Sequence, residues 1–428
     1  MFLSQAAKVR TGFWWLSQDN LEKLIFYLTL LFLPTQLGRH FWPDFSYIYG
    51  IRIDYLSPTV YVSDILIIFL FLITITKKRA IKINKNFLFF LFYLLLTLLV
   101  SKYWQVGVYG FLKILEFSFF AFYCAYAGIK KEILIKVLAI SFLFESLLSI
   151  GQFINKGSLG SFFYFLGERS FNGQTPGIAN ASINGELILR PYGTFSHPNV
   201  LAAFLLIIFT FVIFQSKKIN VFYSLCLIIG AIALLITFSR IAIFLFGIII
   251  LFKLYLFLKT RSKSLLSLLP SIIILIAFLY IVFLSPFKDR FLNLSQSDLS
   301  IVQRGELSTA SYMMFLKSPL FGLGINSFFV NLPNFMSQQK TFFIQPVHNI
   351  YLLLLSELGV FGLSFLLLLI TKAFKKIIKM NNYLLGLLLV EILVLGFFDH
   401  YFFTLQQGQL LFALVVGLSF SKLKLSIE

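Results

Sequence analysis

Charged residues are scarce in this chain. Only 12% of its 428 residues are Asp, Glu, Lys or Arg, whereas 59% are hydrophobic. In soluble domains about 25% of residues are charged, so this balance excludes an ordinary soluble protein. Apolar runs of roughly 17 to 25 residues recur along the chain, and each is long enough to cross about 30 Å of hydrocarbon. The composition therefore predicts a polytopic membrane protein.

Cysteine and histidine are also rare. The two cysteines, Cys124 and Cys226, both lie in apolar runs, so we expect packing residues and no disulfide. The sequence has no His-x-x-His, His-Glu-x-x-His or paired-Cys pattern, and we therefore predict no dedicated metal site and no cofactor. It also lacks a Walker-type glycine loop and a nucleophile elbow, which sets aside the chemistries that depend on them.

The apolar runs are predicted to be helices, because unpaired backbone polar groups are prohibitive in lipid. We predict an all-α fold in which residues 1–428 form a single membrane domain with about twelve transmembrane helices. The predicted spans are 21–37, 58–76, 87–101, 107–128, 133–154, 198–215, 219–238, 241–258, 265–285, 349–371, 383–400 and 405–421.

Basic residues alternate between the predicted loops. They concentrate at residues 77–85, 130–131, 217–218, 259–263 and 372–379, and near both ends of the chain. The positive-inside rule then places both termini in the cytoplasm. The net charge of +19 follows from this topology signal and from attraction to anionic lipid headgroups, and we predict no nucleic-acid partner.

Two extracytoplasmic loops are predicted to be long. Residues 155–197 are rich in Gly, Ser and Asn, and residues 286–348 lie between the ninth and tenth spans. Loops of more than about 12 to 15 residues are uncommon unless they are functional or disordered. The second loop is too apolar for disorder and is expected to contain short helices, including an interfacial helix at 303–317 that ends before Ser318 and Pro319. We therefore expect the functional face to be extracytoplasmic.

His348 is the leading candidate for a catalytic residue. It stands between the second long loop and an apolar span, and Asn349 follows it. The alternative is an interfacial or capping histidine, although Asn349 is an equally good N-cap. Glu357 lies deep in the same span, where a carboxylate indicates either a polar interior or a pairing with a neighbouring helix. We take Asn349 and Glu357 as candidate substrate-binding residues.

Two arginines are further candidates for functional residues. Arg240 follows a short Thr-Phe-Ser turn between two spans, and Arg304 lies in the Gln-Arg-Gly-Glu-Leu segment of the second loop. A guanidinium at a membrane boundary marks function by default, but Arg240 could instead reach lipid phosphate, and Arg304 could be a solvated loop residue.

The segment from Arg190 to Ala202 forms the start of another span. Arg190, His197 and Asn199 are candidate substrate-binding residues in an outward-facing cavity, and helix capping is the structural alternative for each. Asp399 and His400 lie in the turn between the last two spans. We interpret that turn as a structural hairpin first and as a site second.

Several of these segments together resemble the O-antigen ligase and O-antigen polymerase family of bacterial membrane glycan transferases. The similar pieces are the TFSR turn, QRGEL, SPLFGLGINSF and HNIYLLLLSELGVFGL, in that order, with a long outer loop before His348. The resemblance covers residues 190–400 well and residues 1–150 only by topology.

The resemblance implies an enzyme of the bacterial cytoplasmic membrane that works at its outer face. It would transfer a glycan from a polyprenyl diphosphate carrier to an acceptor glycan, lipid or protein, without metal or nucleotide. Arg240 and Arg304 would form a diphosphate clamp, His348 would be the general base, and direct displacement would invert the anomeric carbon. The alternative is a polyprenyl-glycan flippase or another transporter, which the scattered carboxylates Asp64, Glu116, Glu145, Glu357 and Glu391 argue against without excluding it.

Overall fold

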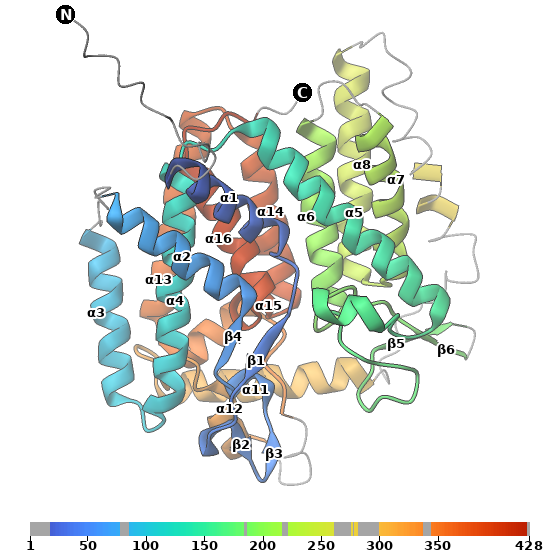
Figure 1. The fold of residues 1–428 in the computed structure, drawn as a ribbon. Helices are drawn as coiled ribbons and strands as arrows, with labels where there is room; N and C mark the ends of the chain where they lie inside the picture. The colour runs from blue at the N-terminus through green and yellow to red at the C-terminus, as the bar shows by residue number, and fades with distance from the viewer. Residues whose placement is uncertain are drawn as a thin grey trace, which may run out of the picture.

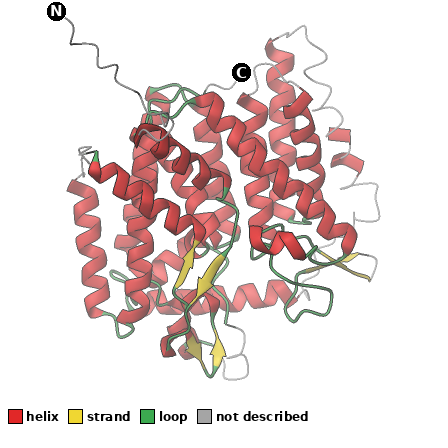
Figure 2. Ribbon diagram, in the orientation of Figure 1, coloured by secondary structure: helices red, strands yellow, loops and turns green. Residues whose placement is uncertain are grey.

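The protein is a bundle in which most of the described helices lie roughly along a common axis (Figure 1). The computed structural model describes residues 18–77, 85–183, 186–215, 221–260, 275–276, 278–280, 299–336 and 344–425. One long helix, α11, lies across the others at one end of the bundle (Figure 1). The short strands gather toward that same end (Figure 2).

Helices occupy eleven of the twelve predicted spans, and most of the ninth, at 265–285, lies outside the described residues. The helices are α1 (Gln18–Leu31), α2 (Val62–Thr76), α3 (Lys85–Val100), α4 (Trp104–Tyr126), α5 (Lys131–Asn155), α6 (Pro198–Gln215), α7 (Val221–Ile236), α8 (Arg240–Thr260), α11 (Leu299–Lys317), α12 (Phe328–Asn331), α13 (Ile350–Lys379), α14 (Tyr383–Phe398), α15 (Tyr401–Thr404) and α16 (Gln406–Phe420). Of the helices described, α4, α5, α6, α8 and α13 are long and apolar enough to cross a membrane, whereas α2, α3, α7, α14 and α16 are shorter apolar helices. The molecule is thus a helical membrane protein, and the count of twelve spans stays a prediction.

The connections between helices contain more structure than their sequences indicate. The α1–α2 connection, for which the predicted spans leave residues 38–57, begins after Leu31. It holds the strands β1 (Gly38–His40), β2 (Tyr47–Ile48), β3 (Ile51–Arg52) and β4 (Thr59–Tyr61), with β1 paired to β4 and β2 to β3, both antiparallel. It also holds the 3-10 turns η2 (Asp44–Ser46) and η3 (Asp54–Leu56). Within 155–197 the chain forms η4 (Ser161–Leu166) and the antiparallel pair β5 (Asn180–Ile183) and β6 (Glu186–Leu189).

The second long loop contains the predicted helix. This helix, α11, ends at Lys317 as expected, because Ser318 and Pro319 follow it, but it begins at Leu299 and is four residues longer than 303–317. It is followed by α12 and the turn η6 (Leu332–Asn334).

Small residues allow the helices to approach closely. A Cβ added to Gly417 of α16 would lie 2.3 Å from the Ala121 carbonyl oxygen of α4, and one added to Gly230 of α7 would lie 1.9 Å from the Phe142 ring of α5. Helices in membranes associate through such small-residue contacts, because lipid provides no hydrophobic force between them. Both cysteines are buried and free, as predicted.

A charged cluster joins three helices inside the bundle. Lys113 Nζ of α4 donates to Asp64 Oδ2 of α2 at 2.6 Å and to Glu116 Oε2 at 3.0 Å. Gln406 Nε2 of α16 donates to Ser63 Oγ at 3.1 Å and also to the Asp64 carboxylate. The interpretation of the carboxylates as scattered is therefore wrong for Asp64 and Glu116, because helix packing brings together residues that lie about fifty positions apart.

Helix α13 is broken at Gly359, and the second long loop fills the break. Gly359 has φ 60° and ψ −164°, so its neighbours lose helical hydrogen bonds. The amides of Leu323 and Gly324 donate instead to the carbonyls of Ser356 and Glu357, at 3.0 and 2.9 Å. Freed backbone groups in a membrane helix need such partners. The loop is thereby fixed against α13, below the helix start that carries His348.

Candidate active site

His348 lies immediately before the N-terminus of α13. Asn349 is the N-cap of this helix, as the sequence allows: its Oδ1 accepts from the amides of Tyr351 and Leu352 at 2.9 and 3.0 Å. The Asn349 Nδ2 donates to the carbonyl of Phe397 at 3.1 Å. His348 is therefore not needed for capping, and its ring is held from another element. A substrate contact by Asn349 stays a prediction.

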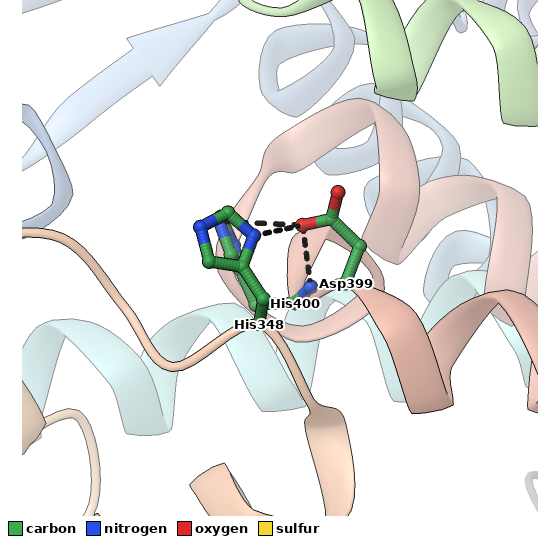
Figure 3. Close-up of side chains that lie close together, drawn as sticks. All are labelled: His348, Asp399 and His400. Atoms are coloured by element: carbon green, nitrogen blue, oxygen red, sulfur yellow. Dashed lines mark hydrogen bonds and ion pairs between the residues drawn. The ribbon is translucent and has the colours of Figure 1, made fainter. Parts of the chain in front are cut away.

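Asp399 holds the imidazole of His348. The Nδ1 atom of His348 lies 3.1 Å from Asp399 Oδ1, and the His400 amide donates to the same oxygen at 2.9 Å (Figure 3). Because a carboxylate can only accept, Nδ1 of His348 carries the proton and Nε2 is left as an acceptor. This hydrogen bond selects the tautomer that a general base requires.

Two further predicted residues extend the network from Asp399. Asn199 Nδ2 donates to Asp399 Oδ2 at 3.0 Å, and Arg190 Nη2 donates to Asn199 Oδ1 at 2.7 Å. Arg190 Nε also donates to the Thr237 carbonyl at 2.6 Å. Four side chains from three distant segments thus form one chain of hydrogen bonds, Arg190 to Asn199 to Asp399 to His348.

Helix α5 positions the segment that carries Arg190 and Asn199. Glu145 accepts from the Thr194 amide and hydroxyl at 2.9 and 2.6 Å, and Gln152 Oε1 accepts from the amides of Tyr192 and Gly193 at 2.9 and 2.7 Å. Gly193 has φ 59°, and a Cβ there would lie 2.3 Å from Glu145 Oε2. The segment then enters α6 at Pro198, the first residue of that helix, where proline is favoured.

His197 is buried close to the charged residues of the network. Burial, together with the nearby charge of Arg190, lowers the pKa of His197 from 6.5 to about 3. The charges of Asp399, His348 and Arg304 also act on this imidazole. Nδ1 of His197 accepts from the Asn199 amide at 3.1 Å, which requires the neutral ring. His197 is therefore a neutral structural neighbour of the network.

The two arginines predicted as a clamp differ in their placement. Arg304, on α11, donates from Nη1 to the Phe398 carbonyl at 3.3 Å, one residue before Asp399. Arg240 is the first residue of α8 and follows the Thr237–Ser239 turn whose Thr237 carbonyl binds Arg190. Arg304 therefore lies beside the network of hydrogen bonds. Arg240 is connected to it less directly, through the preceding turn, whose Thr237 carbonyl accepts from Arg190. The clamp itself stays a prediction.

Glu357 is occupied by the backbone of the second loop. Its Oε2 accepts from the Asn326 amide at 3.1 Å and its Oε1 from the Phe328 amide at 3.0 Å. These bonds fix the loop at the break in α13. Substrate binding by Glu357 is an untested prediction, and the contacts described give it a structural task.

A cavity of about 1270 Å³ opens beside this network. All four histidines of the sequence, His40, His197, His348 and His400, line it, as does Asp399. Away from them the wall becomes apolar, with Phe90, Phe365, Phe412 and Val416 from three different helices. The cavity therefore has a polar part and a long apolar part, which fits an amphiphilic ligand.

The structure places Asp399 and His400 beside His348, in a turn that the sequence interpretation treats as a structural hairpin first and a site second. His400 Nδ1 lies 2.6 Å from Thr404 Oγ1, and its ring lies edge-on to Tyr55 with ring centroids 5.7 Å apart. Both residues directly follow α14, about fifty residues after His348 in the sequence. The Asp-His pair inside an otherwise apolar hairpin was the one available signal.

His348, Asp399 and His400 could also hold a metal ion, since one ligand atom from each lies within 4.8 Å of the others. The Asp399 oxygens, however, already accept from His348, His400 and Asn199. A cation would have to displace these donors. The contacts fit an oriented histidine better than a ligand set.

Comparison with known proteins agrees with this arrangement. Residues 225–367 match the family model described as O-antigen ligase. Over this region the chain is similar to the O-antigen ligase family. The matched region includes Arg240, Arg304, His348 and Glu357 and leaves out Arg190, Asn199 and Asp399. No curated protein matches the chain. The match supports a general role in membrane glycan transfer, with a lipid-linked glycan and an acceptor as partners.

Proposed function

We propose that the protein transfers a glycan from a polyprenyl diphosphate carrier to an acceptor hydroxyl at the extracytoplasmic face of the bacterial cytoplasmic membrane. The observation that supports this proposal best is the His348–Asp399 pair, at 3.1 Å, beside a cavity whose polar part continues into an apolar wall. The apolar wall offers a place for a polyprenyl chain, and the polar part offers one for diphosphate and sugar.

In the proposed reaction His348 Nε2 takes the proton of the acceptor hydroxyl as its oxygen forms a bond to the anomeric carbon. The bond from that carbon to the diphosphate oxygen breaks, and the electron pair leaves with the polyprenyl diphosphate. Asp399 stabilises the imidazolium that forms, through the hydrogen bond to Nδ1. Attack opposite the leaving group inverts the anomeric carbon, and no metal or nucleotide takes part.

Arginine side chains would stabilise the departing diphosphate. A guanidinium keeps its charge at every working pH and binds phosphate oxygens through two parallel hydrogen bonds. Arg304 already acts electrostatically on the site residues, and the turn before Arg240 is bonded to Arg190. Both arginines are proposed to meet the leaving group when donor is bound.

Purified protein in lipid, a lipid-linked glycan donor and an acceptor glycan provide the direct test. We expect wild-type protein to form the new glycosidic bond, and His348→Ala to reduce the rate by roughly 100-fold or more. Asp44→Ala changes an exposed side chain in η2 and serves as the control. If His348→Ala kept near-normal transfer, the base assignment would be wrong.

Two further arms separate competing explanations. A flippase would move the donor across the bilayer and form no bond, which glycan sizing after the reaction distinguishes. A metal centre at His348, Asp399 and His400 would lose activity in EDTA, whereas the oriented-base mechanism keeps it. In cells that lack the gene, glycans shortened to single attached units would indicate that the protein is a polymerase. Accumulation of full-length carrier-linked glycan would indicate that it is a ligase.

A further inference from the structure

Permanent positive charges are few in the cavity wall. Among the described residues that line it, three carry such a charge: Lys113, Arg169 and Lys372. Arg190, Arg240 and Arg304 are not among these lining residues. The arginine that faces the cavity is therefore one that neither the sequence motifs nor the matched family region contains, since Arg169 lies outside residues 225–367.

Arg169 differs from the two lysines in its partners. Lys113 is neutralised by Asp64 and Glu116 at 2.6 and 3.0 Å. Lys372 lies far along α13, about six turns from His348. Arg169 has no carboxylate within ion-pair distance in the part of the chain that the structure describes. Its neighbour Glu168 is taken by Gln152 and by the amides of Leu159 and Gly160, at 2.7 to 2.8 Å.

The contacts that Arg169 does make hold it in place and leave donors free. Its guanidinium lies over the Tyr192 ring, 5.3 Å from the centroid, and Nη1 donates to the Ser196 carbonyl at 3.4 Å. A guanidinium has five N–H donors in a fixed fork, so most remain available. Ring stacking orients such a fork without consuming its charge.

Ser196 supplies a second polar group at the same place. Its Oγ is buried and has no hydrogen-bond partner among the described residues, and Ser196 lines the cavity. Buried hydroxyls without a partner are rare in native structures, and each calls for an explanation. An oxyanion bound next to Arg169 would accept the hydrogen bond that this hydroxyl cannot otherwise make.

The chain itself places Arg169 near the proposed chemistry. Ser196 is followed by His197 and, three residues on, by Asn199, which donates to Asp399 at 3.0 Å. Arg169 is thus tied to the segment that supports the His348–Asp399 pair. We propose that Arg169, assisted by Ser196 Oγ, binds phosphate oxygens of the polyprenyl diphosphate donor. This inference rests on the proposed function for its choice of ligand.

Binding of sugar-free carrier tests the inference without the transfer reaction. Full-length protein in nanodiscs is titrated with polyprenyl diphosphate and, separately, with uncharged polyprenol. We expect Arg169→Gln to weaken diphosphate binding by roughly 10- to 100-fold, as for loss of charge-assisted hydrogen bonds, and to leave polyprenol binding unchanged. The diphosphate affinity of Arg169→Lys should lie between those of wild type and Arg169→Gln, because an ammonium keeps the charge but cannot form the bidentate contact. Ser196→Ala should weaken diphosphate binding severalfold.

Arg39→Gln, an exposed arginine of β1 that does not line the cavity, is the matched control and should bind diphosphate like wild type. Unchanged diphosphate binding by Arg169→Gln would overturn the inference, as would an equal loss for diphosphate and polyprenol, which indicates a structural role. The binding experiment and the transfer assay can fail independently. Arg169-dependent binding without any transfer would sink the proposed function alone, and normal transfer with binding independent of Arg169 would sink this inference alone.

Discussion

Asp399 is the residue on which the candidate site depends most. Its two oxygens meet His348, His400 and Asn199 and so join α13, α14 and α6. If Asp399 orients His348, its role is to select the tautomer with a free Nε2. An acidic residue that only stabilised the fold would act on the melting temperature and not on the chemistry.

Asp399→Asn separates these roles. The amide of asparagine can donate to Nδ1 of His348, which moves the imidazole proton to Nε2 and removes the base. We expect kcat to fall by roughly 100-fold or more with KM and the melting temperature little changed. Asp44→Asn, in exposed η2, should keep wild-type kinetics. A variant that lost stability and activity together would argue for a structural role instead.

Sequence patterns could predict individual residues of the site but not their pairing. His348 stands out by its position at a helix start, and Arg190, His197 and Asn199 stand out by their place before an apolar span. The bond from Asn199 to Asp399 joins residues 200 positions apart, and no spacing rule within one element reveals it. Arg169 lies in a Gly- and Ser-rich loop, where a lone arginine gives no signal of facing a cavity.

At the level of elements, the break in α13 sets the position of the second long loop. Gly359 and Gly322 lie back to back: a Cβ on Gly359 would meet the Leu320 carbonyl at 2.4 Å, and one on Gly322 would meet Glu357 backbone atoms at 2.3 Å. Both have positive φ, at 60° and 70°. Gly322 and Gly359 are thus explained by backbone contact, without a role in chemistry.

Gly359→Ala should therefore destabilise the protein severely. The added methyl clashes with backbone that cannot move aside, and alanine is strained at this φ and ψ, so we expect a loss of about 3 kcal/mol or more. The measurement is thermal unfolding of the purified protein in detergent. Gly305→Ala is the matched control: this glycine of α11 has open space around it, and alanine should be neutral or slightly stabilising. Equal melting temperatures for the two variants would contradict the packing argument.

The helices were predictable because lipid leaves so few alternatives. Apolar length alone placed α2 to α8, α13, α14 and α16, and the Ser318–Pro319 pair located the end of α11. The strands between α1 and α2 were missed, since β1 to β4 are two or three residues long and too short for a period-2 pattern to show. The break at Gly359 was also missed, because an isolated glycine in an apolar run is usually tolerated within a helix.

For the whole molecule, the placement of basic residues bears on its orientation in the membrane. The basic end of α13 leads into a turn where Asn382 binds the Leu423 carbonyl at 2.7 Å and the Leu425 amide at 3.1 Å, beside Lys422 and Lys424. Lys77, at the end of α2, meets Asp19 and Glu22 of α1 at 2.5 Å. Figure 1 places α11 and the strands at the opposite end of the bundle. Basic turns thus gather at one end and the candidate site lies toward the other.

The positive-inside rule predicts that the end carrying the site is extracytoplasmic. Single cysteines test this, because native Cys124 and Cys226 are buried and should react slowly. Gln174→Cys, exposed in the 155–197 loop, should be labelled by a membrane-impermeant maleimide in cells whose outer envelope has been opened. Lys379→Cys, exposed at the far end of α13, should react only after the cytoplasmic membrane is permeabilised. The reverse pattern would place His348 in the cytoplasm, where a carrier-linked glycan displayed on the outer leaflet could not reach it.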